Sequence, residues 1–116
     1  MKEAVVAELI FSQWLGKSGK RYDYYGYPIP TKFNPNQKGN YVYARKNPNG
    51  KWVPVFIGEG DLREAQFNHP QAKCIAEKGA THIHVRVNPL DDERQAETRD
   101  MLEIYENAHA PHGCNR

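Results

Sequence analysis

Cationic and aromatic side chains are interleaved in one short stretch near the N-terminus. Lysine and arginine pair with phosphate groups and aromatic rings stack on unpaired bases, so this combination is typical of a nucleic-acid-binding surface. An ordinary β-hairpin, with alternate tyrosines packed on a sheet and lysines in its turn, predicts the same pattern, and this alternative stays open. The stretch contains Lys17, Lys20, Arg21, Tyr22, Tyr24, Tyr25 and Tyr27.

The positive charge extends beyond this stretch, although the whole chain carries a net charge of only +2. Residues 1–60 hold nine basic and four acidic side chains, whereas residues 61–116 hold seven and ten. The first half also contains eleven of the 13 aromatic residues. We therefore predict weak, sequence-tolerant DNA binding through a basic surface that includes Arg45 and Lys46 as well as Lys32, Lys38 and Lys51.

Cysteine and histidine side chains are numerous enough to supply the ligands of a zinc site. Their spacing matches no closed zinc motif, so we favour solvent-facing histidines and cysteines that remain reduced thiols. Two cysteines are also too few for a disulfide framework, which favours a reducing compartment. The candidate ligands are Cys74, His82, His84, His109, His112 and Cys114.

The 116 residues suffice for one domain. No apolar run approaches the roughly 20 residues that span a bilayer. Acidic residues at Glu3 and Glu8 lie where a signal peptide would be apolar. We therefore predict a cytoplasmic protein without membrane contact.

The first half of the chain predicts two β-hairpins joined by a loop. Residues 5–15 and 21–27 flank a polar turn, although residues 2–12 are equally compatible with a helix. Pro28, Pro30 and Pro35 favour a loop that runs to residue 39. The second hairpin pairs residues 41–45 with 52–57 around an Asn-Pro-Asn-Gly turn, because an Asn-Gly step accepts positive φ angles.

The second half predicts helices around one strand. Asp61 is suited to cap a helix that runs to about residue 69, and a second helix spans residues 70–79. Residues 81–87 alternate as a strand, and residues 91–108 form a long helix. This helix has an apolar stripe of Met101, Leu102, Ile104, Tyr105 and Ala108. On the strand we expect one core face with Ile83, Val85 and Val87, and an opposite face with His82, His84 and Arg86.

Several short motifs occur in a particular order. Asn40-Tyr41-Val42-Tyr43 is followed by Phe56-Ile57-Gly58, whose Phe56 lies thirteen residues after Tyr43. Leu62, His69, the strand entry at residues 79–82, a long helix and a terminal Cys114-Asn115 come next. In order and spacing these motifs resemble the GIY-YIG nuclease superfamily, with residues 41–43 in place of GIY and 56–58 in place of YIG. The resemblance covers roughly residues 16–116.

This resemblance implies an α+β fold with a small, mainly antiparallel three-stranded sheet flanked by helices. We expect residues 40–116 to form the GIY-YIG-like domain and residues 1–39 to form an N-terminal extension, a hairpin and a loop, within one compact unit. Members of the superfamily cleave DNA in a shallow groove with one divalent metal. The resemblance therefore implies DNA as a partner, and Mg²⁺ or Mn²⁺ as the cofactor if the chain is active.

A phosphodiester hydrolase must activate water, neutralise charge that develops on the phosphate, and hold its metal. These tasks require a tyrosine or histidine, an arginine and a carboxylate in one cleft. According to the resemblance, Tyr43 corresponds to the tyrosine of the first motif, His69 to the histidine after the first helix, and Asn115 to the terminal asparagine that braces the site.

Three positions depart from the family pattern. Phe56 replaces the tyrosine of the second motif and has no hydroxyl group. Ala65 stands where the family has arginine, and the nearest arginine, Arg63, is about 200° away around a helix. Thr98 stands at the position of the metal-binding carboxylate, but we expect its neighbour Glu97 to reach the groove as the metal ligand.

These departures favour a GIY-YIG-type domain that binds DNA but whose hydrolytic activity is impaired. The alternative enzyme hypothesis is an active metal-dependent endonuclease that uses Tyr43, His69 and Glu97, with Arg63 or Arg45 supplying positive charge. A third hypothesis is a protein-interaction module on a nuclease fold, because tyrosine is also favoured at protein interfaces. Steep weakening of binding with salt would distinguish a phosphate-binding surface from a protein interface.

Overall fold

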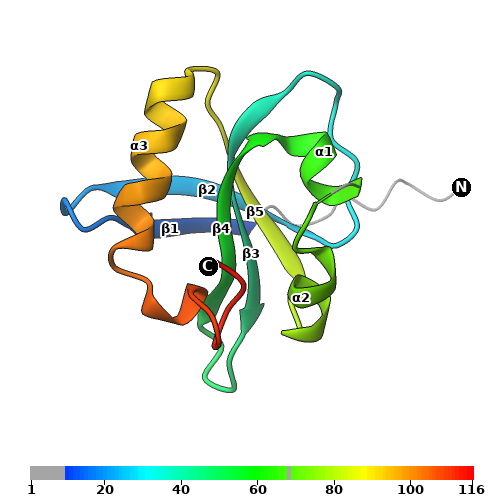
Figure 1. The fold of residues 1–116 in the computed structure, drawn as a ribbon, viewed down its shortest axis with the longest axis vertical. Coiled ribbons are helices and arrows are strands. Elements are labelled where there is room, and N and C mark those ends of the chain that lie inside the picture. The colour runs from blue at the N-terminus through cyan, green and yellow to red at the C-terminus, as the bar shows by residue number, and fades with distance from the viewer. Residues whose placement is uncertain (1–9, 68) are drawn as a thin grey trace, which may run out of the picture.

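The computed structural model describes residues 10–67 and 69–116, which contain five strands and three α-helices (Figure 1). A short 3₁₀ helix, η1 (Glu106–Ala108), follows the last α-helix. The α-helices are α1 (Leu62–Phe67), α2 (Ala72–Glu77) and α3 (Asp91–Leu102). The strands are β1 (Ile10–Leu15), β2 (Arg21–Pro28), β3 (Lys38–Lys46), β4 (Trp52–Asp61) and β5 (His82–Val87).

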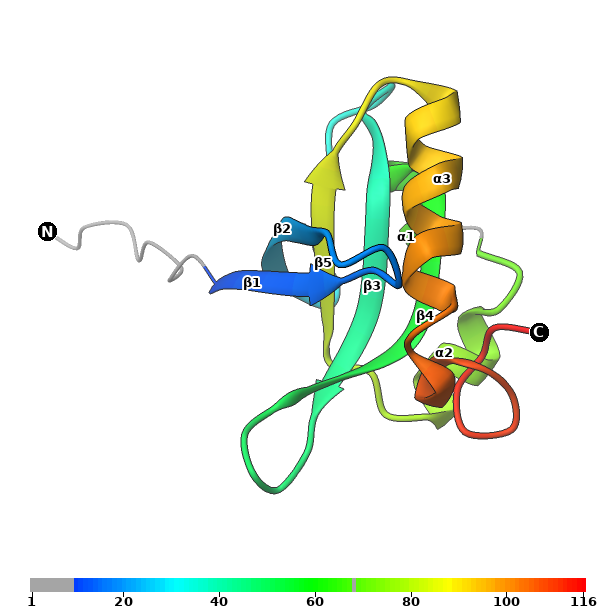
Figure 2. The ribbon, with the colours of Figure 1, turned by 90° about the vertical axis from the view of Figure 1, so that its left-hand side faces the viewer.

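All five strands belong to one antiparallel sheet with the order β1-β2-β5-β3-β4. The predicted α+β class is confirmed, but the sheet has five strands and not three. The reason is that β2 pairs with β5, with Tyr25 opposite Val85, so the N-terminal hairpin extends the sheet. Figure 2 shows this hairpin crossing the other strands, as the twist of a large sheet requires.

The hairpin predicted near the N-terminus is confirmed. Residues 10–12 lie in β1, so the alternative helix over residues 2–12 is wrong for these three. The rest of that range lies outside the described residues.

Local sequence signals explain where several elements begin and end. Gly50 has a φ angle of +78° in the turn between β3 and β4, a conformation that glycine adopts without steric cost. Asp61 caps α1, because its Oδ1 accepts the backbone N–H groups of Arg63 and Glu64, each at 3.0 Å. Gly79, with a φ angle of +82°, follows the end of α2.

Helices cover both faces of the sheet (Figure 1). Along β3 the side chains alternate, so Tyr41 and Tyr43 point to one face and Val42 to the other. The first face packs against α1 and α2, with Leu62 and Ile75 in its core. The second packs against α3 and η1, with Met101 and Ala108 in its core, and includes Trp14 and Tyr24 from the N-terminal hairpin.

The expectation that β5 has a single core face is wrong. His84 is fully buried on the α3 side, where its ring lies 4.5 Å from that of Trp52, and its Nδ1 forms a 2.7 Å hydrogen bond with Ser12 Oγ. Val87, expected in the core, is 57% exposed at the end of the strand. His84 is buried because the N-terminal hairpin covers a face that would otherwise meet solvent. Val87 lies beyond Val85, the last residue of β5 that pairs with this hairpin.

The helix predicted over residues 91–108 ends earlier, at Leu102. The chain then turns, so that the Tyr105 hydroxyl accepts the backbone N–H of Leu15 at 2.7 Å and the Tyr105 ring contacts Trp14. A helix that continued beyond Leu102 would not bring Tyr105 to Leu15 and Trp14 in this way. Ile104, assigned to the apolar stripe, is exposed.

The prediction of two reduced thiols is wrong, because Cys74 of α2 and Cys114 of the C-terminal segment form a disulfide. This removes the argument from cysteine chemistry for a reducing compartment, so the cytoplasmic location stays a prediction. Within the described residues, none of the helices has the length and apolar character needed to cross a membrane.

Candidate functional site

A shallow groove of about 630 Å³ is lined by β4, α1, α3 and the C-terminal segment. It contains several residues of the motifs that resemble the GIY-YIG superfamily. The residues on which its chemistry depends are Tyr41, Phe56, Glu59, His69, Thr98 and Asn115.

Tyr41 reaches this groove because of the strand register. It lies opposite Gly58 of β4. A Cβ atom on Gly58 would come within 2.8 Å of the Tyr41 ring and its hydroxyl, so a glycine is required there. The Tyr41 ring stacks on Phe56 with 6.2 Å between centroids, which leaves its hydroxyl at the side of His69.

The Tyr41 hydroxyl and the His69 imidazole form a hydrogen bond of 2.8 Å between Oη and Nε2. His69 Nδ1 accepts the backbone N–H of Gln71 at 2.9 Å, so it carries no proton. In a neutral imidazole the proton must then reside on Nε2. His69 therefore donates to Tyr41, and the phenolic proton of Tyr41 is free to be donated to another acceptor.

Burial keeps both groups in their neutral forms. The pKa of Tyr41 is raised well above its ordinary value, chiefly by desolvation and also by Tyr43 and Glu59. Burial lowers the pKa of His69, since it disfavours the charged imidazolium. The pair therefore consists of a protonated phenol and a neutral imidazole.

Tyr43, the residue expected from the first motif, has a different role. Its hydroxyl donates to the backbone carbonyl of Ala65 at 2.7 Å, and burial raises its pKa to about 12. Its ring lies near His69, with 6.0 Å between centroids. Tyr41, which lines the groove beside His69, was not among the site residues predicted from the sequence.

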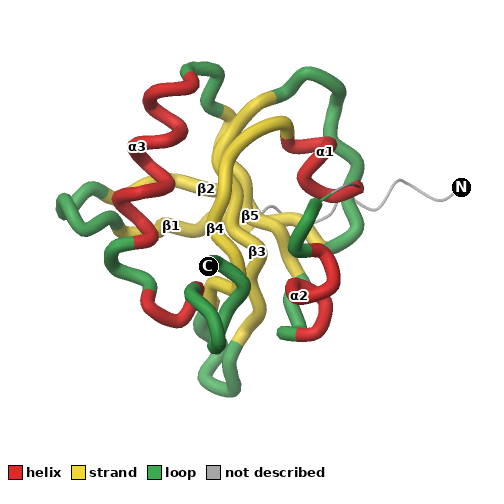
Figure 3. Tube along the Cα trace, viewed as in Figure 1, coloured by secondary structure: helices red, strands yellow, loops and turns green. Residues whose placement is uncertain are grey.

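Asn115 is held against the edge of the sheet. Its side-chain oxygen accepts the N–H of Ile57 and its amide nitrogen donates to the Ile57 carbonyl, both at 2.9 Å. The backbone N–H of Cys114 donates to the carbonyl of Val55. Figure 3 shows the C-terminal loop beside β4, the strand that contains Val55 and Ile57. The segment thus occupies hydrogen-bonding groups of the edge strand β4 and forms one border of the groove.

From α3, the groove receives Thr98 and not Glu97. Glu97 is buried with the N-terminal hairpin, where it accepts hydrogen bonds from Tyr24 Oη at 2.5 Å and Arg86 Nε at 3.1 Å. Desolvation raises its pKa, while Tyr24 and Arg86 oppose this shift. The Thr98 hydroxyl accepts a hydrogen bond from the Asn40 amide at 3.1 Å.

The groove's charged side chains are largely engaged within the protein. Glu59 pairs with Arg94 of α3 at 2.8 Å, and Asp61 caps α1. Arg63, expected to supply positive charge, is exposed on α1 and is not among the residues that line the groove. Within residues 10–67 and 69–116, no three histidine, cysteine, aspartate or glutamate side chains form a group that could hold a metal ion.

The predicted nucleic-acid-binding residues form two separate groups (Figure 1). Lys17, Lys20 and Arg21 lie at the turn between β1 and β2, which is anchored on α3 because Asp100 accepts hydrogen bonds from Ser18. The second group, Arg45 and Lys46, lies at the end of β3, where the Lys46 ammonium is 5.0 Å from the centre of the Trp52 ring.

Comparison of the chain with protein-family models, curated proteins and solved structures found no match.

Proposed function

We propose that this chain is a GIY-YIG-like domain that binds DNA and whose capacity for phosphodiester hydrolysis is impaired. The observation that carries the proposal is the direction of the hydrogen bond between His69 and Tyr41. Because His69 donates, the Tyr41 hydroxyl has its own proton available for an acceptor in the groove. A phosphate oxygen of a nucleic-acid backbone is such an acceptor, and hydrogen bonds to charged groups are stronger than neutral ones.

The same geometry is unfavourable for hydrolysis. A general base must accept a proton from water, but His69 has no free ring nitrogen and Tyr41 holds its proton at neutral pH. Phe56 offers no second phenol, and Thr98 offers no carboxylate for a divalent metal. Mg²⁺ or Mn²⁺ would therefore find a poor site in this groove.

The exposed cations of the β1–β2 turn would supply long-range attraction for the phosphate backbone. Lys20 and Arg21 line a hollow that also contains Arg86, Glu93 and Glu97. Arg86 is paired with Glu97, and its guanidinium lies 5.9 Å from the centre of the Tyr22 ring. This arrangement provides cations and an aromatic ring on one surface, a combination suited to single-stranded DNA.

The proposal is tested by fluorescence anisotropy with labelled single-stranded and duplex DNA over a range of salt concentrations. We expect binding at low salt that weakens steeply as salt rises, and a clear loss of affinity in the Lys20→Ala, Arg21→Ala double variant. The charge-matched control, Lys73→Ala with Arg99→Ala, removes two exposed cations elsewhere and should bind like the unmodified protein.

Three outcomes would contradict parts of the proposal. An unchanged affinity in the Lys20 and Arg21 variant would exclude the hairpin as the contact surface. A lack of DNA binding at low salt would overturn the proposal and favour the protein-interaction module. Efficient nicking of plasmid DNA with Mg²⁺ or Mn²⁺, lost in Tyr41→Phe, would show an active endonuclease.

A further inference from the structure

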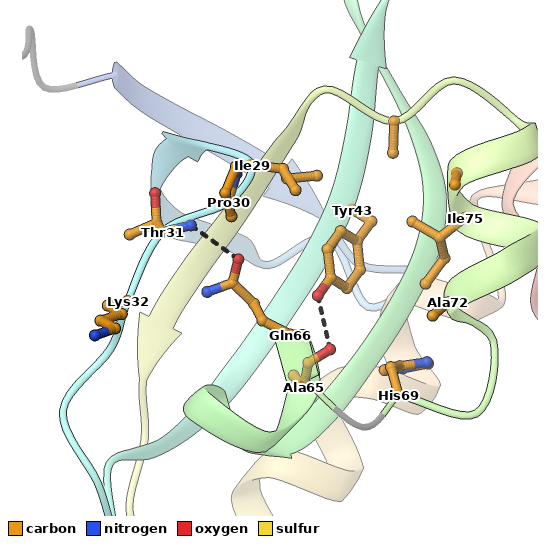
Figure 4. A pocket seen from close by; sticks show the side chains of 12 residues that line it. Ile29, Pro30, Thr31, Lys32, Tyr43, Ala65, Gln66, His69, Ala72 and Ile75 are labelled. Carbon is orange, nitrogen blue, oxygen red and sulfur yellow. Dashed lines mark hydrogen bonds between the residues drawn. The ribbon is translucent and has the colours of Figure 1, made fainter.

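A second cavity, of about 430 Å³, lies on the α1 and α2 side of the sheet (Figure 4). It is bordered by α1, α2 and the loop after β2, and it shares Ala65 and His69 with the groove described above. Its volume is in the range of small-molecule sites in proteins. Of the cations expected to contact DNA, Lys32 alone lines this cavity, and the other lining residues call for a separate explanation.

The walls of this cavity are mainly apolar. Four alanines leave space where larger side chains would fill the core, and the Tyr43 ring lies between the loop and α2 (Figure 4). The Tyr43 hydroxyl is bonded to a backbone carbonyl, and both ring nitrogens of His69 have partners. The apolar lining consists of Ile29, Pro30, Ala65, Ala72, Ile75, Ala76 and Ala80.

Two hydrogen-bond donors on this cavity lack acceptors. Gln66 Oε1 accepts the backbone N–H of Thr31 at 3.0 Å, which fixes the orientation of the amide. Its Nε2 atom is buried and has no hydrogen-bond partner among the described residues. Lys32 is exposed and, within the same part of the chain, forms no hydrogen bond or ion pair. In Figure 4 the Gln66 amide nitrogen points to the side on which Lys32 lies.

We propose that this cavity binds a small apolar carboxylic acid, such as a medium-chain fatty acid or an arylalkanoic acid. The apolar part of the ligand lies against the alanines and the Tyr43 ring, where its removal from water stabilises the complex. The carboxylate accepts hydrogen bonds from Lys32 Nζ and, after a small movement of the side chain, from Gln66 Nε2. A buried donor without a partner is costly, so the ligand also removes an unfavourable feature of the empty cavity.

Other ligand classes fit these observations less well. A neutral hydrocarbon would leave the buried Gln66 Nε2 without an acceptor and would make no use of the exposed Lys32 ammonium. A phosphate or a nucleotide would place a strongly hydrated anion against alanine and isoleucine side chains, at a high desolvation cost. A single carboxylate on an apolar body matches both the two donors and the apolar walls.

The test uses sodium octanoate as the ligand and 1-octanol as its uncharged counterpart, with binding followed by NMR chemical shifts of backbone amides. We expect octanoate at up to millimolar concentration to shift the amides of Ala65, Ala72 and Ala76, and octanol to bind about tenfold more weakly, which corresponds to the loss of one charged contact. No shift of these amides by octanoate in the folded protein would overturn the proposal. Equal affinity for octanol and octanoate would overturn the assignment of a carboxylate.

Two variants with matched controls separate the parts of the proposed site. Lys32→Met should weaken octanoate about tenfold and leave octanol unaffected, whereas Lys73→Met, on exposed α2 surface, should change neither. Ala76→Leu extends an exposed position into the cavity and should abolish binding of both ligands, whereas Ala96→Leu on α3 should not. Unchanged octanoate affinity in both Lys32→Met and Ala76→Leu would place the ligand elsewhere and overturn the proposal.

Discussion

His69 Nε2 lies 2.8 Å from Tyr41 Oη, and the backbone N–H of Gln71 determines which of the two groups donates. The backbone of Gln71 thus fixes the tautomer of His69. This tautomer makes His69 the donor, so the Tyr41 hydroxyl keeps its own proton for another acceptor. The short link between α1 and α2 therefore controls a side chain on β3.

The tautomer of His69 can be observed directly. We expect ¹⁵N NMR to show a proton on Nε2 and none on Nδ1 near neutral pH. On acidification the ring should take up its second proton below the ordinary pKa of 6.5, because burial lowers this pKa. A neutral ring with its proton on Nδ1 would contradict the assigned direction of donation.

His84 should make stability depend on pH. Its folded-state pKa is lowered to about 4, chiefly by burial, from an ordinary value of 6.5. As pH falls, His84 is therefore protonated in the unfolded chain before it is protonated in the folded protein. The free energy of unfolding decreases between about pH 6.5 and pH 4, by about 3 kcal/mol in total. Urea unfolding at several pH values should show this slope, and His84→Gln should remove most of it. The more exposed neighbour provides the control, since His82→Gln should keep most of the slope.

Glu97 should contribute to stability more than to metal binding. Glu97→Ala leaves the buried Tyr24 hydroxyl with only the weak acceptor Met101 Sδ, 3.5 Å away, and breaks the pair with Arg86, so the free energy of unfolding should fall by about 2–3 kcal/mol. Glu97→Gln, which retains an acceptor, should cost less. If Mg²⁺ stabilised the unmodified protein against unfolding and Glu97→Gln abolished this effect, Glu97 would be a metal ligand after all.

The disulfide between Cys74 and Cys114 should stabilise the fold and the groove together. It closes a loop with a sequence separation of 40, for which the chain-entropy model gives about 4 kcal/mol. Reduction, or Cys114→Ser, should therefore lower the free energy of unfolding by roughly this amount. Hydrogen exchange should also become faster at the Ile57 amide, because Asn115 follows the cysteine directly. Unchanged stability after complete reduction would show that the disulfide does not form in solution.

Much of the fold follows from local signals in the sequence. The Asn-Gly step before β4, the capping side chain of Asp61 and Gly79 after α2 each act on neighbouring residues, so they predict where elements begin and end. The pairing of β2 with β5 depends on contacts between segments far apart in the chain, and no local pattern predicts it. The burial of His84 against Ser12 follows from this pairing, and Tyr105, which comes after the end of α3 at Leu102, contacts Leu15 and Trp14 of the same hairpin.

The candidate site was predictable in part. The motif order brought His69 and Asn115 to one groove, because both positions follow from the succession of elements. The motif order predicted Tyr43 and not Tyr41 as the site tyrosine. Both tyrosines lie on the same face of β3, so their spacing in the sequence does not distinguish them. The bond of Tyr43 to the Ala65 carbonyl and the space left by Gly58 decide between them, and both depend on the packed structure.

The central claim is that the Tyr41 hydroxyl donates a hydrogen bond to the bound nucleic acid, and the affinity of Tyr41→Phe for labelled DNA tests it most directly. We expect about a tenfold loss of affinity at low salt, as for one hydrogen bond to a charged group. Tyr43→Phe should bind like the unmodified protein, because the Tyr43 hydroxyl donates to the Ala65 carbonyl and does not line the groove. Denaturant unfolding of both variants will confirm that they remain folded. Equal affinity of folded Tyr41→Phe and the unmodified protein would contradict the account.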